Sequence, residues 1–189
     1  MSVDPYTLPP DLPVPEDDGA ADHLTGMTVP RLELPTTDQR ALDLAEAAQQ
    51  LLVLYIYPRT GRPGEELPTG WDDIPGARGC TPQSCSFRDL HAEIAATGAH
   101  TLGLSAQNVA DQHEVVERLH LPYALASDPL LDLAGALGLP TFDAPEGIGR
   151  IYKRLTFVAA EGRIEKVFYP VFPPNRNAQD VLEWLQANR

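Results

Sequence analysis

The stretch QLLVLYIYP, residues Gln50–Pro58, decides the fold of this chain. It is a continuous apolar run rich in Val, Ile and Tyr, and it ends at a proline. A run of this kind predicts a strand that is buried on both faces of a sheet, as in parallel sheets covered by helices. We therefore place it at the centre of the sheet, with Leu54 in the core.

Strands and helices alternate on both sides of this run. Short apolar stretches before it indicate two short strands, and helical periodicity with capping residues marks the helices after it. Thr81 and Asn108 are the expected N-caps of the first two helices, and Gly98 is the expected end of the first. The expected elements are strands at 31–35 and 41–47, a helix at 81–98, a strand at 100–106, a helix at 108–121, a strand at 123–129, a helix at 130–140, a hairpin at 153–171 around an EGR turn, and a helix at 177–189.

This order predicts an α/β fold with a mixed central sheet flanked by helices. The domain spans residues 26–189, and Phe157 in the hairpin should share its core. Residues 1–25 carry five prolines in the first fifteen positions, followed by an acidic stretch. Such a segment lacks strand or helix periodicity, so we expect an extended N-terminal arm.

The charge balance argues against several classes of partner. The chain has 14 Lys and Arg against 27 Asp and Glu, for a formal charge of −13, and its basic residues are scattered. A nucleic-acid or anionic-membrane surface is therefore not expected. The first residues lack the pattern of a signal peptide, and no apolar run approaches a membrane span. We expect a cytoplasmic protein that is not bound to a membrane.

The two cysteines, Cys80 and Cys85, follow a long Gly- and Pro-rich loop at residues 59–79. Cys80 falls at the start of the first expected helix, where unpaired N–H groups and the helix dipole favour a thiolate, aided by the nearby Arg78 and Arg88. It is the candidate reactive thiol, expected at a solvent edge. Cys85 lies more than a turn further in and should behave as an ordinary thiol.

The spacing of the two cysteines indicates a switch. Five residues along an ideal helix separate their Cα atoms by roughly 8.6 Å, whereas a disulfide needs them within about 7 Å. Cys80 and Cys85 can therefore bond only after the first turns of the helix unwind. Two other interpretations remain open: a pair of ordinary buried thiols, or a metal- or partner-binding module, although no further Cys or His completes a metal-binding pattern.

At these residues the chain resembles a known family. YIYP, GCTPQSCSFRDL, TLGLSA, ALASDP and KRLTFVAAEGRIEKVF occur in the order and approximate spacing of a Q-type peroxiredoxin, also called bacterioferritin-comigratory protein. The resemblance covers about residues 28–188. It implies a thioredoxin-like fold and a thiol peroxidase that acts on hydrogen peroxide or alkyl hydroperoxides without a cofactor or metal.

The resemblance also implies roles for particular residues. Cys80 corresponds to the peroxidatic cysteine and Cys85 to the resolving cysteine of the same chain. Arg154, in KRLTF, matches the family arginine that faces the site and holds the thiolate. A thioredoxin-like dithiol would restore both thiols, and the protein would be a monomer or a homodimer. A thiol–disulfide oxidoreductase or redox sensor on the same fold is the alternative.

One departure from the family pattern concerns the peroxide pocket. The family carries Thr or Ser three residues before the peroxidatic cysteine, where this chain has Ala77. Pro58 lies 22 residues before Cys80 where the family proline lies seven before, which measures an insertion of 15 residues. Either the insertion returns Thr60 to the pocket as a substrate-binding hydroxyl, or that hydroxyl is lost. Trp71, within the insertion, is the candidate for a hydrophobic plug that pins the loop.

Overall fold

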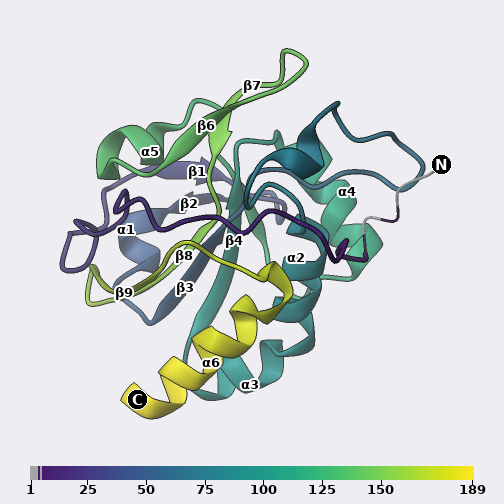
Figure 1. Cartoon of the computed structure of the whole chain (residues 1–189). Helices are drawn as coiled ribbons and strands as arrows, with labels where there is room; N and C mark the ends of the chain where they lie inside the picture. Colours follow the sequence, from purple (N-terminus) through teal and green to yellow (C-terminus); the bar gives the residue numbers. More distant parts are fainter. Residues whose placement is uncertain (1–3, 5) are drawn as a thin grey trace.

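The computed structural model describes residue 4 and residues 6–189, and at its centre lies a five-stranded mixed sheet (Figure 1). The run singled out in the sequence forms the middle strand, β3, which pairs with β4 in parallel and with β8 in antiparallel orientation. The mixed-sheet α/β prediction is confirmed. The strand order is β5 (Leu125–Ser127), β4 (His100–Ser105), β3 (Leu52–Ile56), β8 (Leu155–Ala160) and β9 (Arg163–Phe168).

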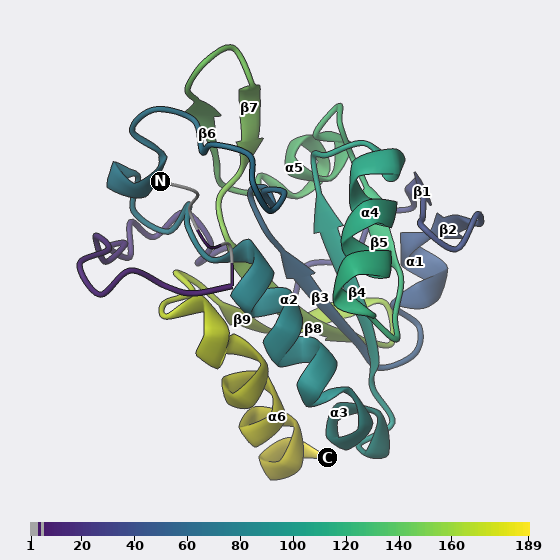
Figure 2. The same ribbon diagram turned by 90° about the vertical axis from the view of Figure 1, so that its right-hand side faces the viewer.

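The alternation of side chains along β3 divides the core into two clusters, one on each face of the sheet. Val53 and Tyr55 point to one face, together with Tyr57 just after the strand. Helices cover this face, and α2 and α6 lie side by side across it (Figure 2). These helices are α2 (Cys80–Asp89), α3 (His91–Ala96), α4 (Val109–Leu119) and α6 (Asn177–Asn188).

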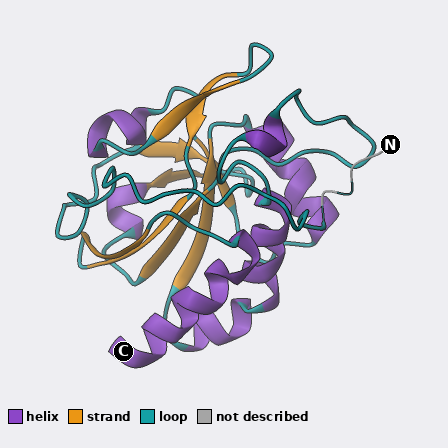
Figure 3. Ribbon diagram, in the orientation of Figure 1, coloured by secondary structure: helices purple, strands orange, loops and turns teal. Residues whose placement is uncertain are grey.

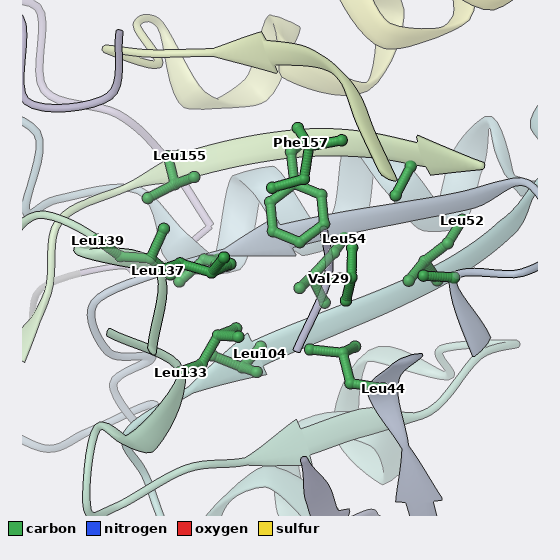
Figure 4. Close-up of a cluster of buried hydrophobic side chains, with 14 of the residues drawn as sticks. Val29, Leu44, Leu52, Leu54, Leu104, Leu133, Leu137, Leu139, Leu155 and Phe157 are labelled. Atoms are coloured by element: carbon green, nitrogen blue, oxygen red, sulfur yellow. The ribbon is translucent and has the colours of Figure 1, made fainter. Parts of the chain in front are cut away.

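Leu54 and Phe157 lie in the cluster on the opposite face, and neither side chain is exposed (Figure 4). Short helices and strands cover this face, and long loop segments connect them (Figure 3). Leu24 and Val29, from the segment that leads into the sheet, are buried in the same cluster. The short elements are β1 (Glu33–Pro35), β2 (Ala41–Asp43), α1 (Leu44–Ala47) and α5 (Asp132–Leu137).

The segment expected as an extended arm contacts the rest of the chain along its described length; residues 1–3 and 5 lie outside the described residues. Its trace crosses the front of the molecule in Figure 1. Asp18 accepts hydrogen bonds from Lys153 Nζ at 2.7 Å and from the Tyr169 hydroxyl at 2.8 Å. These two donors lower the pKa of Asp18 to about 2. Nearer the N-terminus, the Asp4 carbonyl accepts a hydrogen bond from Arg78.

Three sequence predictions of local structure are wrong in detail. The helix expected at 81–98 is two helices, because Leu90 adopts φ −100° and ψ 10° and ends α2. Its first residue is Cys80, and Gly79 occupies the N-cap position expected for Thr81. Residues 41–47 are not one strand, because the Asp43 carboxylate accepts hydrogen bonds from the N–H groups of Ala45 and Glu46 and starts α1.

Other predictions are confirmed, whereas a hairpin and two short 3-10 helices, η1 (Trp71–Asp73) and η2 (Pro174–Arg176), were missed. Asn108 caps α4 by accepting a hydrogen bond from the Asp111 N–H at 2.8 Å. The β8–β9 hairpin forms as expected. The missed hairpin consists of β6 (Thr141–Ala144) and β7 (Gly149–Tyr152), whose strands lack a clear apolar alternation. Within the described part of the chain, no helix combines the length and the apolar character that crossing a membrane requires.

We predict that Leu54→Ala and Phe157→Ala each lower the free energy of unfolding by about 2–5 kcal/mol, because each leaves a cavity in a filled core. Chemical denaturation monitored by circular dichroism measures this. Leu130 is 79 % exposed and provides the matched control: Leu130→Ala should change stability by less than about 0.5 kcal/mol. Equal losses in all three variants would contradict this placement of the core.

Candidate active site

The sheet register brings Cys80 and Arg154 together. Ile56, the last residue of β3, pairs with Leu155, the first residue of β8, so Arg154 lies beside the chain as it leaves the central strand. After the long loop the chain enters α2 at Cys80. The Arg154 Nη2 donates a hydrogen bond to Cys80 Sγ at 3.1 Å.

Arg154 is buried, with 3 % of its surface exposed. Its guanidinium also donates to the carbonyls of Gly76 at 3.3 Å, Ala77 at 3.1 Å and Arg78 at 3.2 Å, and to the Gln83 side chain. Among the described residues no carboxylate lies within 4.0 Å of it. Because an uncompensated buried charge is costly, these carbonyl oxygens stabilise the cation, and the one ionisable group it touches is the Cys80 thiol.

Cys80 is more enclosed than the sequence suggested. It is 2 % exposed, so the expected position at a solvent edge is wrong. Its sulfur accepts a hydrogen bond from the Arg59 backbone N–H at 3.4 Å and lies 3.7 Å from the Ala77 carbonyl. A cavity of about 20 Å³ borders it. A cavity of this size admits a group little larger than water.

Gly79 allows the abrupt turn into α2. Its φ of +103° lies in the region that glycine favours. A Cβ at this position would overlap Pro174 and lie 2.8 Å from Leu8 Cδ2. The turn therefore depends on the absence of a side chain, and it delivers Cys80 to the first position of the helix, beside backbone N–H groups that have no partner within the helix.

Cys85 lies on the same helix and is half-buried. Burial raises the pKa of its thiol, so the neutral form prevails near pH 7. Both cysteines are free, as expected for two positions on one intact helix. The side chains of Arg78 and Arg88 hydrogen-bond to groups other than Cys80: Arg78 donates to Asp72 and the Asp4 carbonyl, and Arg88 donates to Asp89 and the Leu119 carbonyl.

The loop at 59–79 returns its first residues to the site. Thr60 is buried, but its hydroxyl and its N–H both donate to Gln107 Oε1, at 3.0 and 2.8 Å. The structure thus brings the Arg59 N–H to Cys80 and directs the Thr60 hydroxyl to Gln107. Trp71 is 3 % exposed and packs in an apolar cluster with Ala77 and Ile151, as the plug interpretation predicts.

Sequence reasoning missed several residues that hold the site. Gln83 is fully buried; it accepts from Arg154 and donates to Asn177 at 2.9 Å. It lies three residues after Cys80, so the i, i+3 rule for helix faces could have found it. Tyr55 and Tyr123 hold the middle of α2 by donating to the Ser84 hydroxyl at 3.2 Å and to its carbonyl at 2.9 Å. Burial raises the pKa of both phenols, which keeps them as donors.

Comparison with known proteins identifies the family of the chain. The family model described as Redoxin matches residues 24–182. Chloroplastic peroxiredoxin Q of rice (Oryza sativa subsp. japonica) is 27 % identical over 163 residues, which are 86 % of this chain and 66 % of that protein. The chain thus spans slightly less than two thirds of the length of this curated relative.

Solved structures show the same fold. Peroxidoxin BcpB of Mycobacterium tuberculosis has a TM-score of 0.67 and 28 % identity, with 88 % of this chain and 99 % of that chain covered. PrxQ of Xylella fastidiosa, solved as a mutant, has a TM-score of 0.70 and 22 % identity, with 87 % and 97 % covered. These similarities confirm the predicted thioredoxin-like fold.

We predict that Arg154→Gln slows alkylation of Cys80 by iodoacetamide at neutral pH about ten- to a hundredfold, since a charge-assisted hydrogen bond to the sulfur is lost. The Cys85→Ser background isolates the one thiol, and mass spectrometry follows the reaction. The matched control is Lys153→Gln, which removes the neighbouring cation that pairs with Asp18 and should leave the rate unchanged. An equal effect of both substitutions would show that general charge, and not this contact, activates Cys80.

Proposed function

Since this chain belongs to the Redoxin family, we propose that it is a thiol-dependent peroxidase that reduces hydrogen peroxide or alkyl hydroperoxides. The observation that carries the proposal is the contact at 3.1 Å between Cys80 Sγ and a buried guanidinium that has no carboxylate partner among the described residues. A guanidinium in this position stabilises a thiolate by a hydrogen bond and does not protonate it, so the sulfur remains nucleophilic.

The first step is the attack of the Cys80 thiolate on the terminal oxygen of the peroxide. A sulfur–oxygen bond forms and the oxygen–oxygen bond breaks, so the sulfur is oxidised by two electrons to a sulfenic acid. The departing oxygen takes up a proton and leaves as water or an alcohol. Arg154 is placed to stabilise the negative charge as it moves from sulfur to oxygen.

The Arg59 backbone N–H is the donor nearest the sulfur after Arg154, at 3.4 Å. We propose that this N–H donates a hydrogen bond to the peroxide, as the hydroxyl three residues before the peroxidatic cysteine does in the family. Thr60 anchors this turn through its two hydrogen bonds to Gln107. It would contact the peroxide itself only after its hydroxyl leaves Gln107.

In the second step, Cys85 attacks the sulfenic sulfur; a disulfide forms and water leaves. This requires α2 to unwind, because an intact helix holds the two Cα atoms roughly 8.6 Å apart. Since α2 ends at Asp89 and α3 begins at His91, α2 can unwind without α3. The hydrogen bonds from Tyr55 and Tyr123 to Ser84 must break in the process.

A dithiol reductant of the thioredoxin type would complete the cycle by thiol–disulfide exchange, which returns both cysteines to thiols. We also propose a cytoplasmic location, because a reducing compartment supplies such dithiols. Cell fractionation tests this location. Sedimentation of the reduced and oxidised protein decides between a monomer and a homodimer.

The test of the peroxidase is intact mass and free-thiol count after one equivalent of hydrogen peroxide. We expect the parent to lose both thiols and two hydrogens, Cys85→Ser to accumulate a sulfenic acid that a dimedone-type reagent traps, and Cys80→Ser to remain unchanged. A parent that keeps both thiols for hours would refute the proposal and favour a thiol–disulfide oxidoreductase.

A further prediction concerns pH. Burial raises the pKa of Cys85 while α2 is intact, and after α2 unwinds the exposed thiol has the ordinary pKa of a cysteine, roughly 8.5, so in either state its thiolate fraction increases from pH 6 to pH 9. Disulfide formation after a single turnover, followed by tryptophan fluorescence, should therefore accelerate from pH 6 to pH 9. A rate that falls over this range would contradict a thiolate attack by Cys85.

A further inference from the structure

The segment that leads the chain into α2 is held on two sides. On its inner side, Arg154 donates hydrogen bonds to three successive carbonyls, those of residues 76–78. On its outer side lies the N-terminal arm, whose trace passes the start of α2 (Figure 2). The arm takes part in neither chemical step of the proposed cycle, yet it contacts the residues that position Cys80.

The first described residues of the arm contact the two residues that precede Cys80. The Asp4 carbonyl accepts a hydrogen bond from Arg78 Nη2 at 2.9 Å. Leu8 is partly buried and packs against Gly79, since its Cδ2 lies 2.8 Å from the position that a Cβ on this glycine would occupy. The arm therefore lies directly against the turn that starts α2.

The rear part of the arm is fixed firmly to the body of the domain. Pro15 lies beside Gly76, with ring atoms 3.6 Å from the position of a Cβ on that glycine. The Asp18 carboxylate accepts two side-chain hydrogen bonds, at 2.7 and 2.8 Å. Leu24 is fully buried in the core. This part of the arm cannot leave without disturbing the core.

The front part, residues 4–8, is held by weaker contacts. Tyr6 is 45 % exposed, its hydroxyl accepts a hydrogen bond from Arg118 Nη1 at 3.3 Å, and its ring centroid lies 5.8 Å from the guanidinium carbon. Hydrogen bonds and cation–π contacts at exposed positions contribute little stability each. The front part can therefore detach while the rear part and the domain stay folded, as segments of low local stability do.

We propose that the arm is a strap that controls the unwinding of α2, with Leu8 as the positioning residue. The inference rests on the proposed peroxidase and concerns its second step. Cys80 can leave Arg154 only if its neighbour Gly79 moves, and this movement breaks the contact with Leu8. The closed strap keeps Cys80 beside Arg154 for the attack on peroxide, and the open strap lets Cys80 and Cys85 meet.

The experiment compares Leu8→Ala with the parent by two measurements. Quenched flow with intact-mass detection follows sulfenic acid formation and its conversion to the disulfide after one equivalent of hydrogen peroxide. Leu8→Ala should accelerate the disulfide step about tenfold and change sulfenic acid formation by less than about twofold, because it removes an apolar contact at the helix start alone. Amide hydrogen exchange of the reduced protein should accelerate about tenfold in α2 and stay unchanged in β3.

Two further variants complete the design. The hydrogen bond of Tyr6 joins the arm to Arg118 on α4, so an effect of Tyr6→Ala on α2 is transmitted by the arm. This variant should accelerate the disulfide step and the exchange of α2, as Leu8→Ala does. Val14 is 65 % exposed on the same arm and provides the matched control: Val14→Ala should leave both measurements at their parental values.

The outcomes separate the strap from the peroxidase. A parent that does not react with peroxide would refute the peroxidase, and hydrogen exchange alone would then decide the strap. Parental exchange in α2 of Leu8→Ala would overturn the strap, as would a parental disulfide step in a reacting protein. Exchange that accelerates equally in α2 and β3 would also overturn it, because it marks a general loss of stability. If Leu8→Ala does not fold, Tyr6→Ala decides by the same criteria.

Discussion

The site depends on one buried cation. The Arg154 guanidinium joins the start of β8, the carbonyls of residues 76–78, Gln83 and the sulfur of Cys80. None of these partners except the thiol can ionise near neutral pH, and no described carboxylate lies within 4.0 Å of the guanidinium. Its burial is therefore compensated by carbonyl dipoles and by the hydrogen bond to the Cys80 sulfur, so that the position of the thiol and the folding of the loop depend on the same group.

In the cycle that we propose, this arrangement also links oxidation of Cys80 to unwinding of α2. In the reduced state, the hydrogen bonds from Arg154 to the Cys80 sulfur and to the Gln83 side chain both hold the first turn of α2 against Arg154. A neutral sulfenic acid attracts the guanidinium less strongly than a thiolate does. Oxidation thus removes part of the stabilisation that keeps Cys80 and Cys85 apart.

The sequence predicted those features that depend on local patterns and missed those that depend on tertiary contacts. The apolar run of β3, the Asn108 cap and the β8–β9 hairpin were readable because each is encoded within a few residues. The break at Leu90 and the β6–β7 hairpin carry no comparable local signal. Residue patterns alone gave no role to Arg154, and only the family resemblance indicated one. The contact of Arg154 with Cys80 follows from the pairing of β3 with β8, which are separated by some 100 residues of chain.

The loop insertion and the missing hydroxyl at residue 77 are parts of one arrangement. Ala77 is 1 % exposed, and its side chain lies in the apolar cluster with Trp71 and Ile151 that the insertion completes. A threonine hydroxyl here would be buried among hydrocarbon groups without an obvious partner, which is costly. With the insertion present, a small apolar residue therefore fits this position better. The insertion begins with Arg59. The backbone N–H of Arg59 is the donor nearest the Cys80 sulfur after Arg154.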